Sequence, residues 1–294
     1  MVEPFPEPHP KGREVRIANK TLRNRVYWSR RLLQTPQTFT NWSDVLKDMA
    51  LGRAGKGPET LTFRTRSGMH IDTPNRPGAR VPVYEVFADD VYRFEWFLGP
   101  LLRRPITVID VGGHVGTFTC RLTQLHKDAT VTAFEPSATT ADYLRRNVEN
   151  NGVAGRVTVV QAALAADSGT AVFDDNGAGS GLNGLMSARG TGTGVATEVE
   201  AVSFADAVKR AGDKVDVIKI DCEGGEYDLV LNSNPDDWAS VQRVVIEHHP
   251  VAGHSWPELR DFFDKVGLAV QDEDFAGEHG CVWLSRDPLP AVHA

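Results

Sequence analysis

Carboxylate and imidazole side chains follow two apolar stretches of the chain, and they are of the types needed for proton transfer or metal binding. Asp221 and Glu223 come directly after one stretch, and Glu247, His248 and His249 end another. Neighbouring parallel strands of an open α/β sheet end at the same edge, so we expect these five side chains to converge there. Such a group can deprotonate a hydroxyl or hold a divalent metal ion.

Within this group the residue types suggest separate roles. We interpret Asp221 and Glu223 as groups that position an acceptor or a metal ion, and His248 or His249 as the base. One of the two histidines is expected to point outward. If a metal is bound, its expected ligands are Asp221, Glu247 and His248. Glu226 falls in the first turn of a following helix, where an acid stabilises the helix dipole, so we interpret it as structural.

A glycine-rich turn follows a third apolar run. Three glycines stand within five residues after Asp110, at Gly112, Gly113 and Gly116. Glycine lets a turn bend sharply and lets the backbone approach a ligand, and free N–H groups at the next helix start add partial positive charge. Glu135 ends the next apolar run, about 20 residues further on, where an acid accepts hydrogen bonds from ribose hydroxyls. The pattern predicts a nucleoside ligand, either a dinucleotide or S-adenosylmethionine.

The elements that position these residues alternate regularly after residue 105. Strands are predicted at 106–111, 130–134, 157–161, 215–220 and 242–247, and helices at about 116–126, 138–150, 203–210, 225–232 and 255–266. This alternation indicates a doubly wound α/β fold with a mostly parallel sheet. The last two strands, at 268–271 and 281–284, have no helical pattern between them, so we expect that pair to be antiparallel.

The chain before residue 106 is predicted to be an N-terminal α+β extension, followed by the main domain at 106–287 and a tail at 288–294. It contains a proline-rich leader at 1–10, a basic segment at 16–33 that can form a helix, and a further helix at 40–49. A hairpin at 61–72 and a proline-punctuated loop at 74–82 follow, before an aromatic-rich segment at 83–97. Residues 1–35 carry a net charge of +5, which suits an exposed arm or docking to a sister subunit in a homo-oligomer.

Glycines are also dense between residues 174 and 195, where the strand–helix rhythm stops. A long irregular insertion in a compact domain often covers a ligand. Because this one follows the third strand of the sheet, we interpret it as a lid, with an inert hairpin as the alternative.

Composition excludes some classes of partner. The 294 residues are 41% hydrophobic and carry a net charge of −7, which argues against nucleic acid as a main partner. No apolar run reaches the roughly 18 residues of a membrane span, and the first residues lack the apolar core of a signal peptide. The three cysteines are far apart and odd in number, which is typical of free thiols in the cytoplasm.

Five motifs, taken in order, resemble the FkbM-type family of S-adenosylmethionine-dependent methyltransferases over about residues 84–285. They are Asp110 to Gly116, Phe134 to Pro136, Asn147 to Asn151, Ile218 to Glu226 and Glu247 to His249. The resemblance implies a seven-stranded class I methyltransferase fold and methyl transfer, usually to oxygen, often in natural-product or glycan tailoring. Where the family more often has Ala-Asn, this chain has Gly113 and His114.

The resemblance also implies which residues contact the cofactor, while Asp221 and Glu223 face the reaction centre. The expected cofactor contacts are Tyr92, Asp110, Gly112, Gly113, His114, Gly116, Thr117, Glu135, Pro136, Ala162 and Ala163. We therefore expect methylation of a hydroxyl on a small polar or sugar-containing molecule. The alternatives are an NAD-dependent oxidoreductase and a non-catalytic binding module on the same fold.

Overall fold

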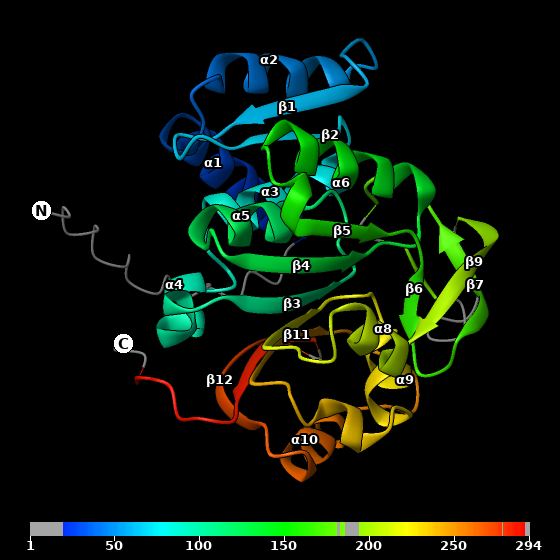
Figure 1. Cartoon of the computed structure of the whole chain (residues 1–294). Coiled ribbons are helices and arrows are strands. Elements are labelled where there is room, and N and C mark those ends of the chain that lie inside the picture. Colours follow the sequence, from blue (N-terminus) through cyan, green and yellow to red (C-terminus); the bar gives the residue numbers. More distant parts are fainter. Residues whose placement is uncertain (1–19, 181–182, 186–193, 278, 292–294) are drawn as a thin grey trace, which may run out of the picture.

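The computed structural model describes residues 20–180, 183–185, 194–277 and 279–291, and its centre is a seven-stranded sheet (Figure 1). The strands are β3 (Ile106–Val111), β4 (Ala129–Phe134), β5 (Val157–Val160), β10 (Val217–Ile220), β11 (Arg243–His248), β12 (Ala269–Ala276) and β13 (His279–Ser285). Their order across the sheet is β12-β13-β11-β10-β3-β4-β5. All the pairs from β11 to β5 are parallel, whereas β13 is antiparallel to both of its neighbours. The predicted fold class is confirmed.

Two apolar layers cover this sheet because successive side chains of a strand point to opposite faces. Val217 and Ile218 are consecutive residues, yet they belong to different buried clusters. One cluster includes apolar side chains of α8 (Phe204–Arg210), α9 (Glu226–Leu231) and α10 (Trp256–Lys265). The other includes side chains of α4 (Phe94–Leu98), α5 (Thr117–Leu125) and α6 (Ala138–Asn150). Both faces are therefore buried, which accounts for the nearly continuous apolar sequence of the central strands.

A second sheet stands beside the first, after β5 (Figure 1). It contains β6 (Ala163–Ala165), β7 (Gly169–Asp175), β8 (Gly184–Leu185) and β9 (Val195–Ser203), in the order β6-β9-β7-β8. This sheet was not predicted from the sequence, because half of the residues of β7 and β9 are exposed and these strands lack the apolar runs of the main sheet. Of the segment interpreted as a lid, residues 181–182 and 186–193 lie outside the described part of the chain.

The N-terminal extension forms a layer on one side of the main domain, seen at the top of Figure 1. It consists of α1 (Lys20–Thr38), α2 (Trp42–Arg53), the antiparallel hairpin β1 (Thr60–Arg64) and β2 (His70–Pro74), and α3 (Pro77–Phe87). The helix and hairpin expected at 40–49 and 61–72 are present. Of the loop predicted at 74–82 only residues 75–76 are irregular, because β2 extends to Pro74 and α3 begins at Pro77. Proline is favourable in the first turn of a helix, and Pro82 is accommodated inside this one. The proline-rich leader lies outside the described residues.

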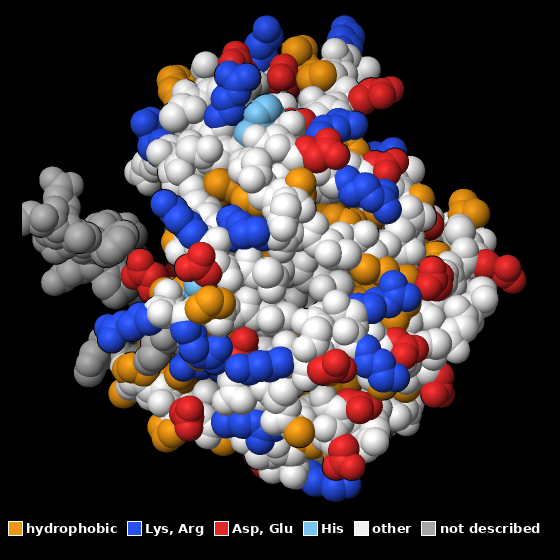
Figure 2. All heavy atoms as spheres, viewed as in Figure 1, with side chains coloured by type: hydrophobic (Ala, Val, Ile, Leu, Met, Phe, Trp, Pro, Cys, Tyr) orange, Lys and Arg blue, Asp and Glu red, His pale blue; other side chains and the backbone are white. Residues whose placement is uncertain are grey.

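Short 3₁₀ helices connect several of these elements: η1 (Gly99–Arg103), η2 (Ala154–Arg156) and η3 (Pro235–Trp238). Within the described residues, every helix is too short or too polar to cross a lipid bilayer. On the face shown in Figure 2, basic and acidic side chains are interspersed over the surface.

Candidate active site

A cavity lies beyond the carboxyl ends of β3, β4 and β10, where a doubly wound sheet binds its ligands. Its open space, with the mouth and adjoining solvent included, is about 870 Å³. Its lining includes eleven of the predicted site residues: Tyr92, Gly112, Gly113, His114, Thr117, Glu135, Pro136, Ala162, Ala163, Asp221 and Glu223. The predicted cofactor and acceptor residues thus share one cavity.

The glycine turn after β3 packs against the exit of β10. The backbone N–H groups of Gly112 and Gly113 donate to the carbonyl oxygen of Phe134, at 3.0 and 2.8 Å. Gly112 has a φ of +73°, and a Cβ on it would lie 1.9 Å from the backbone oxygen of Asp221. Only glycine fits at this position, because any side chain would push the turn away from Asp221.

Glu135 lies at the wall of the cavity with both carboxylate oxygens engaged by backbone. Oε2 accepts a hydrogen bond from the N–H of His114, and Oε1 accepts one from the N–H of Ser137, each at 2.9 Å. Burial raises the pKa of Glu135 to about 7, although both hydrogen bonds act in the opposite direction. The carboxyl group is therefore held in place and titrates near neutral pH.

Lys219, which lies in the motif from Ile218 to Glu226 and was given no role there, contacts both the glycine turn and Asp221. Its Nζ donates to the carbonyl oxygens of Gly112 at 2.7 Å and Val111 at 3.2 Å. The same atom lies 3.4 Å from Oδ1 of Asp110 and 3.5 Å from Oδ2 of Asp221. Burial disfavours its charge, but the two carboxylates outweigh burial and raise the pKa of Lys219. The signal for it was a lysine inside an otherwise apolar strand.

Two predicted cofactor residues act from behind the cavity wall. Asp110 is fully buried, and its Oδ2 accepts a hydrogen bond from Oγ1 of Thr119 at 2.6 Å. Gly116 has a φ of +85° at the N-cap of α5, close to Leu144. They shape the turn, and neither is among the residues that line the cavity.

Beside Asp221 and Glu223, which line the cavity, stands an acidic rim formed by Glu226, Glu247 and His249, and these three are not among the lining residues. Glu223, at a φ of +57°, lies with its Oε2 3.7 Å from Nε2 of His249. Nδ1 of His249 is 3.0 Å from Oε1 of Glu226, which also accepts the backbone N–H of Cys222. Although burial opposes protonation, Glu226 above all raises the pKa of His249 to about 10. Burial, with Glu247 and Asp221 nearby, raises the pKa of Glu85 in α3 to about 8.

His248 and His249 point to opposite sides of the sheet at the end of β11, because successive residues of a strand point to opposite faces. The ring of His248 is buried, stacked on Trp256 with the ring centres 5.3 Å apart and tilted against Phe275 at 5.4 Å, and burial lowers its pKa to about 4. His248 is therefore the histidine that points away from the cavity. Among the described residues, the groups that could hold an ion contain His249 in its place, so Asp221, Glu247 and His248 do not gather as a ligand set.

Several other residues that line the cavity were not predicted as contacts from the sequence. Ser180, Asn183 and Leu185 of the glycine-rich segment line the cavity, as do Pro82 of α3 and Phe173 of β7. The described part of the glycine-rich segment therefore covers part of the cavity, as a lid would.

Comparisons with known proteins identify a matching family and similar methyltransferases. The family model of the methyltransferase FkbM domain matches residues 110–271. The chain is 25% identical over 214 residues to methyltransferase sdnD of Sordaria araneosa, covering 63% of this chain and 80% of that protein. It is also 25% identical over 184 residues to methyltransferase 1 of Beauveria bassiana, covering 56% of this chain and 73% of that protein. A solved S-adenosylmethionine-dependent methyltransferase of Agrobacterium tumefaciens superposes with a TM-score of 0.47 at 11% identity, covering 78% of this chain and 71% of that one.

Proposed function

The chain belongs to the FkbM methyltransferase domain family, and from this premise we propose that it methylates a hydroxyl group of a small polar or sugar-containing natural product. Its activity as an S-adenosylmethionine-dependent methyltransferase follows from the family and from the curated relatives. The hydroxyl acceptor is our inference. The observation that supports it is that one cavity joins the glycine turn and Glu135 to the carboxylates of Asp221 and Glu223.

The residues of the first half of the cavity fit S-adenosylmethionine. Gly112 and Gly113 line the cavity, so the backbone of the turn can lie against the ligand, and Glu135 offers a carboxylate to ribose hydroxyls. Tyr92, Ala162 and Ala163 add walls on either side. When bound, the sulfonium supplies an activated methyl group, so the protein's own task is to orient the acceptor and exclude water.

The second half of the cavity suits a polar acceptor. Asp221 is held by Lys219, and Glu223 stands beside His249, so both carboxylates can accept hydrogen bonds from hydroxyl groups. An alcohol is a poor nucleophile until its proton leaves, and His249 is the one of the two candidate histidines that lies at this rim. Because the pKa of His249 is raised to about 10, its ring already carries a proton at neutral pH and cannot take another from the hydroxyl. It can instead release that proton when it binds a cation, and the bound cation would make the hydroxyl more acidic.

Ligand binding distinguishes this proposal from the two alternatives. S-adenosylhomocysteine should raise the melting temperature by several degrees, whereas NAD should leave it unchanged, because a ligand stabilises only the state that binds it. A shift with NAD alone would favour an oxidoreductase. Binding of S-adenosylhomocysteine without methyl transfer to any hydroxylated compound in a broad panel would favour a non-catalytic module.

The variant Asp221→Asn tests the assignment of the rim. It keeps the shape of the side chain but removes its charge, so we expect methyl transfer to fall at least about 100-fold while the affinity for S-adenosylhomocysteine changes little. Asp206→Asn, an exposed acid beside Lys209, is the matched control and should keep full activity. NMR of the product from a ¹³C-labelled methyl donor shows whether the methyl group is on oxygen. Undiminished turnover in Asp221→Asn would refute the role of Asp221.

A further inference from the structure

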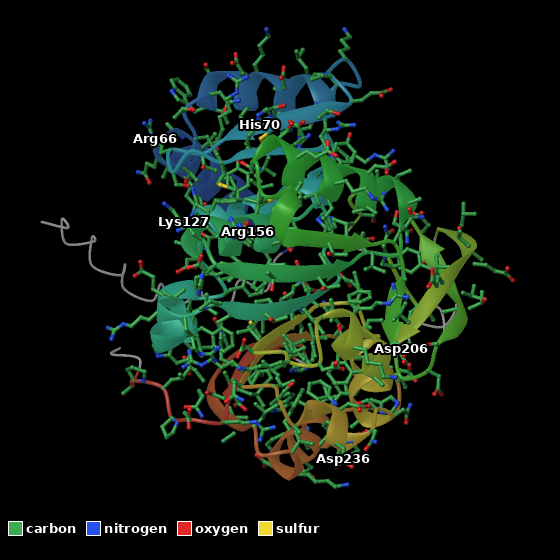
Figure 3. The ribbon with its side chains drawn as sticks, viewed as in Figure 1. Arg66, His70, Lys127, Arg156, Asp206 and Asp236 are labelled. Atoms are coloured by element: carbon green, nitrogen blue, oxygen red, sulfur yellow. The ribbon has the colours of Figure 1, made fainter. Side chains whose placement is uncertain are left out.

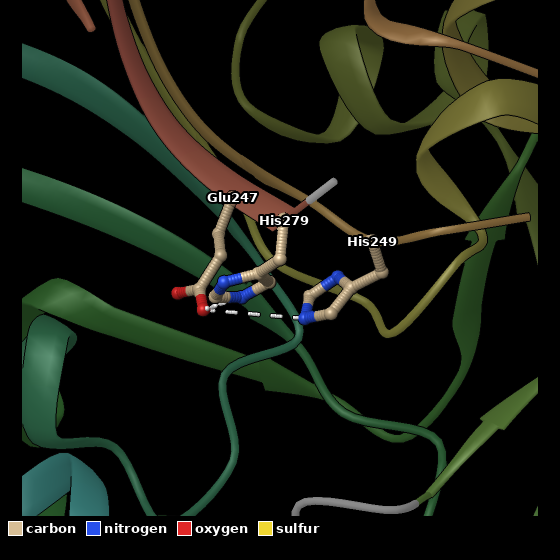
Figure 4. A group of neighbouring side chains, drawn as sticks. All are labelled: Glu247, His249 and His279. Atoms are coloured by element: carbon tan, nitrogen blue, oxygen red, sulfur yellow. Dashed lines mark hydrogen bonds and ion pairs between the residues drawn. The ribbon is translucent and has the colours of Figure 1, made fainter. Parts of the chain in front are cut away.

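Three side chains at the ends of β11 and β13 gather at the acidic rim (Figure 4). Glu247 lies on β11, His249 follows it two residues later, and His279 begins the antiparallel neighbour β13. Glu247 pairs with Cys281 and His248 with Gly280, so the same register places His249 opposite His279. Because side chains two residues apart share a face, this register brings all three to one side of the sheet.

Their distances suit a single ion. Nε2 of His279 lies 2.6 Å from Oε1 of Glu247, and Nε2 of His249 lies 4.0 Å from that same oxygen. Ligand atoms that are each about 2.1 Å from one ion can be up to about 4.2 Å apart. The three ligand atoms lie within 4.8 Å of one another. A small rotation of the half-buried His279 ring closes the group around an ion.

A buried carboxylate orients the central histidine. Glu226 is fully buried, and its Oε1 is 3.0 Å from Nδ1 of His249, which leaves Nε2 directed toward Glu247 and Glu223. A histidine that binds a metal usually donates its other ring N–H to a carboxylate in this way, which fixes both tautomer and orientation. A surface ion pair between His249 and Glu247 would not need this second, buried partner.

The surroundings of His249 carry more negative than positive charge. Four carboxylates lie around it, those of Asp221, Glu223, Glu226 and Glu247. Lys219 is already shared between Asp221 and Asp110. Half-buried charges of one sign are costly unless a cation balances them. In the free chain the protonated rings of His249 and His279, paired with Glu226 and Glu247, supply part of that balance. A divalent ion at Nε2 of His249 would displace these protons and take over their role.

We propose that Glu247, His249 and His279 bind one divalent transition-metal ion, with Glu223 in reach as a fourth ligand. Two imidazoles and a carboxylate favour Zn²⁺, Fe²⁺, Co²⁺ or Mn²⁺ over Mg²⁺ and Ca²⁺, which prefer ligand sets made only of oxygen. The binding stands on the geometry alone. Its use rests on the proposed function: an ion here is at the acceptor end of the cavity, where it would hold the hydroxyl oxygen and lower the pKa of that group.

The test is metal binding by the full chain, without an affinity tag and after treatment with a chelator. Titration with Zn²⁺ or Co²⁺ by calorimetry should show one bound equivalent, and Co²⁺ should give visible absorption bands of a nitrogen- and oxygen-ligated site. His279→Asn and Glu247→Gln should each weaken binding at least about tenfold, as should Glu226→Gln through its hold on His249. His254→Gln is the matched control, because His254 forms a surface pair with Glu258 at 2.9 Å and belongs to no group of three possible ligands among the described residues.

Either of two results would refute the proposed metal site. One is that the wild-type chain binds neither Zn²⁺ nor Co²⁺, and the other is that His279→Asn binds them as tightly as His254→Gln does. Affinity for S-adenosylhomocysteine, measured on every variant, shows that each has folded. Failure of the proposed function is a separate result: a chain that binds the metal as described but methylates no hydroxyl would leave the site standing and reject the acceptor.

Discussion

At the scale of single residues, Gly112 is the position with the least freedom in the site. Its φ of +73° disfavours any side chain, and an added Cβ would lie 1.9 Å from the backbone oxygen of Asp221. Gly112→Ala should therefore lower the free energy of unfolding by about 2–4 kcal/mol, from the left-handed backbone and the overlap together. Urea unfolding measures this loss. The affinity for S-adenosylhomocysteine should fall at least about tenfold, because the turn must move.

A variant at Gly152 separates the cost of the left-handed backbone from the cost of the overlap with Asp221. Its φ of +66° is close to that of Gly112, but a Cβ there meets no atom within 4 Å. Gly152→Ala should cost only about 1 kcal/mol, the backbone contribution alone, and leave ligand affinity unchanged. Equal losses in the two variants would show that the contact with Asp221 does not restrict the turn.

Glu135 should make both stability and ligand binding depend on pH. Its pKa is raised from 4.5 to about 7, so the folded chain holds this proton more tightly than the unfolded chain does. Stability from this group is complete below pH 4.5 and is lost as the pH rises to about 7, by no more than about 3 kcal/mol. Urea unfolding at several pH values should show this slope in the wild type, and Glu135→Gln should have a smaller one, with the remainder coming from Glu85, whose pKa is also raised by burial.

Ligand affinity should change in the opposite direction. Ribose hydroxyls donate to a carboxylate better than to a carboxylic acid, so binding of S-adenosylhomocysteine should strengthen by up to about tenfold between pH 6 and pH 8. Calorimetry measures this change, and Glu135→Gln should bind weakly at both values. The same pH dependence in Glu135→Gln would assign it to another group.

Some residues of the candidate site could be predicted from the sequence and others could not, for physical reasons. The glycine turn, Glu135, Asp221 and Glu223 were predictable because parallel strands present their carboxyl ends at one edge. Because side chains two residues apart in a strand share a face, the sequence could also have shown that His249 lies on the same side as Glu247 and that His248 lies on the other. His279 was not predictable, because its position opposite His249 depends on the register of a hairpin between β12 and β13.

At the scale of elements, the parallel sheet and its helices were predicted to within two residues at each end, because apolar runs and turns repeat regularly there. The second sheet was missed. Its strands β7 and β9 are mostly exposed, so they lack the apolar alternation that identifies a half-buried strand. Packing against α5 and the hairpin makes α3 a helix despite two prolines, which the local sequence could not reveal.

The exposed second sheet should respond to the ligand. Phe173, Ser180 and Leu185 line the cavity, yet most of β7 and β9 faces solvent. Amide hydrogens of 169–180 should therefore exchange faster than those of β3 and β10 in the free chain. S-adenosylhomocysteine should slow exchange at 173–180 by about tenfold or more, as hydrogen-exchange mass spectrometry can measure. Slowing at the glycine turn without slowing at 173–180 would reject the interpretation of this segment as a lid.

At the scale of the whole molecule, the N-terminal layer is attached to the turn that lines the cavity. Asn147 of α6 is fully buried, and its Oδ1 accepts the N–H of Asp72 at 2.7 Å. Its Nδ2 donates to the carbonyl oxygens of Asp72 at 2.9 Å and Val115 at 2.7 Å. Asn151 adds a parallel link to His70 on the same strand, β2 (Figure 3). One side chain therefore connects β2, α6 and the loop between His114 and Gly116.

This connection predicts that Asn147→Ala weakens both folding and ligand binding. The change leaves backbone groups of Asp72 and Val115 without their buried partner, so the free energy of unfolding should fall by about 2–4 kcal/mol in urea. Affinity for S-adenosylhomocysteine should fall several-fold, because Val115 belongs to the turn beside the cavity. Asn232→Ala is the control, since Asn232 is exposed at the C-cap of α9 and, among the described residues, its side chain bonds only to Asp228 of that helix, at 3.0 Å. Lost stability with unchanged affinity would mean that the N-terminal layer supports the fold without shaping the site.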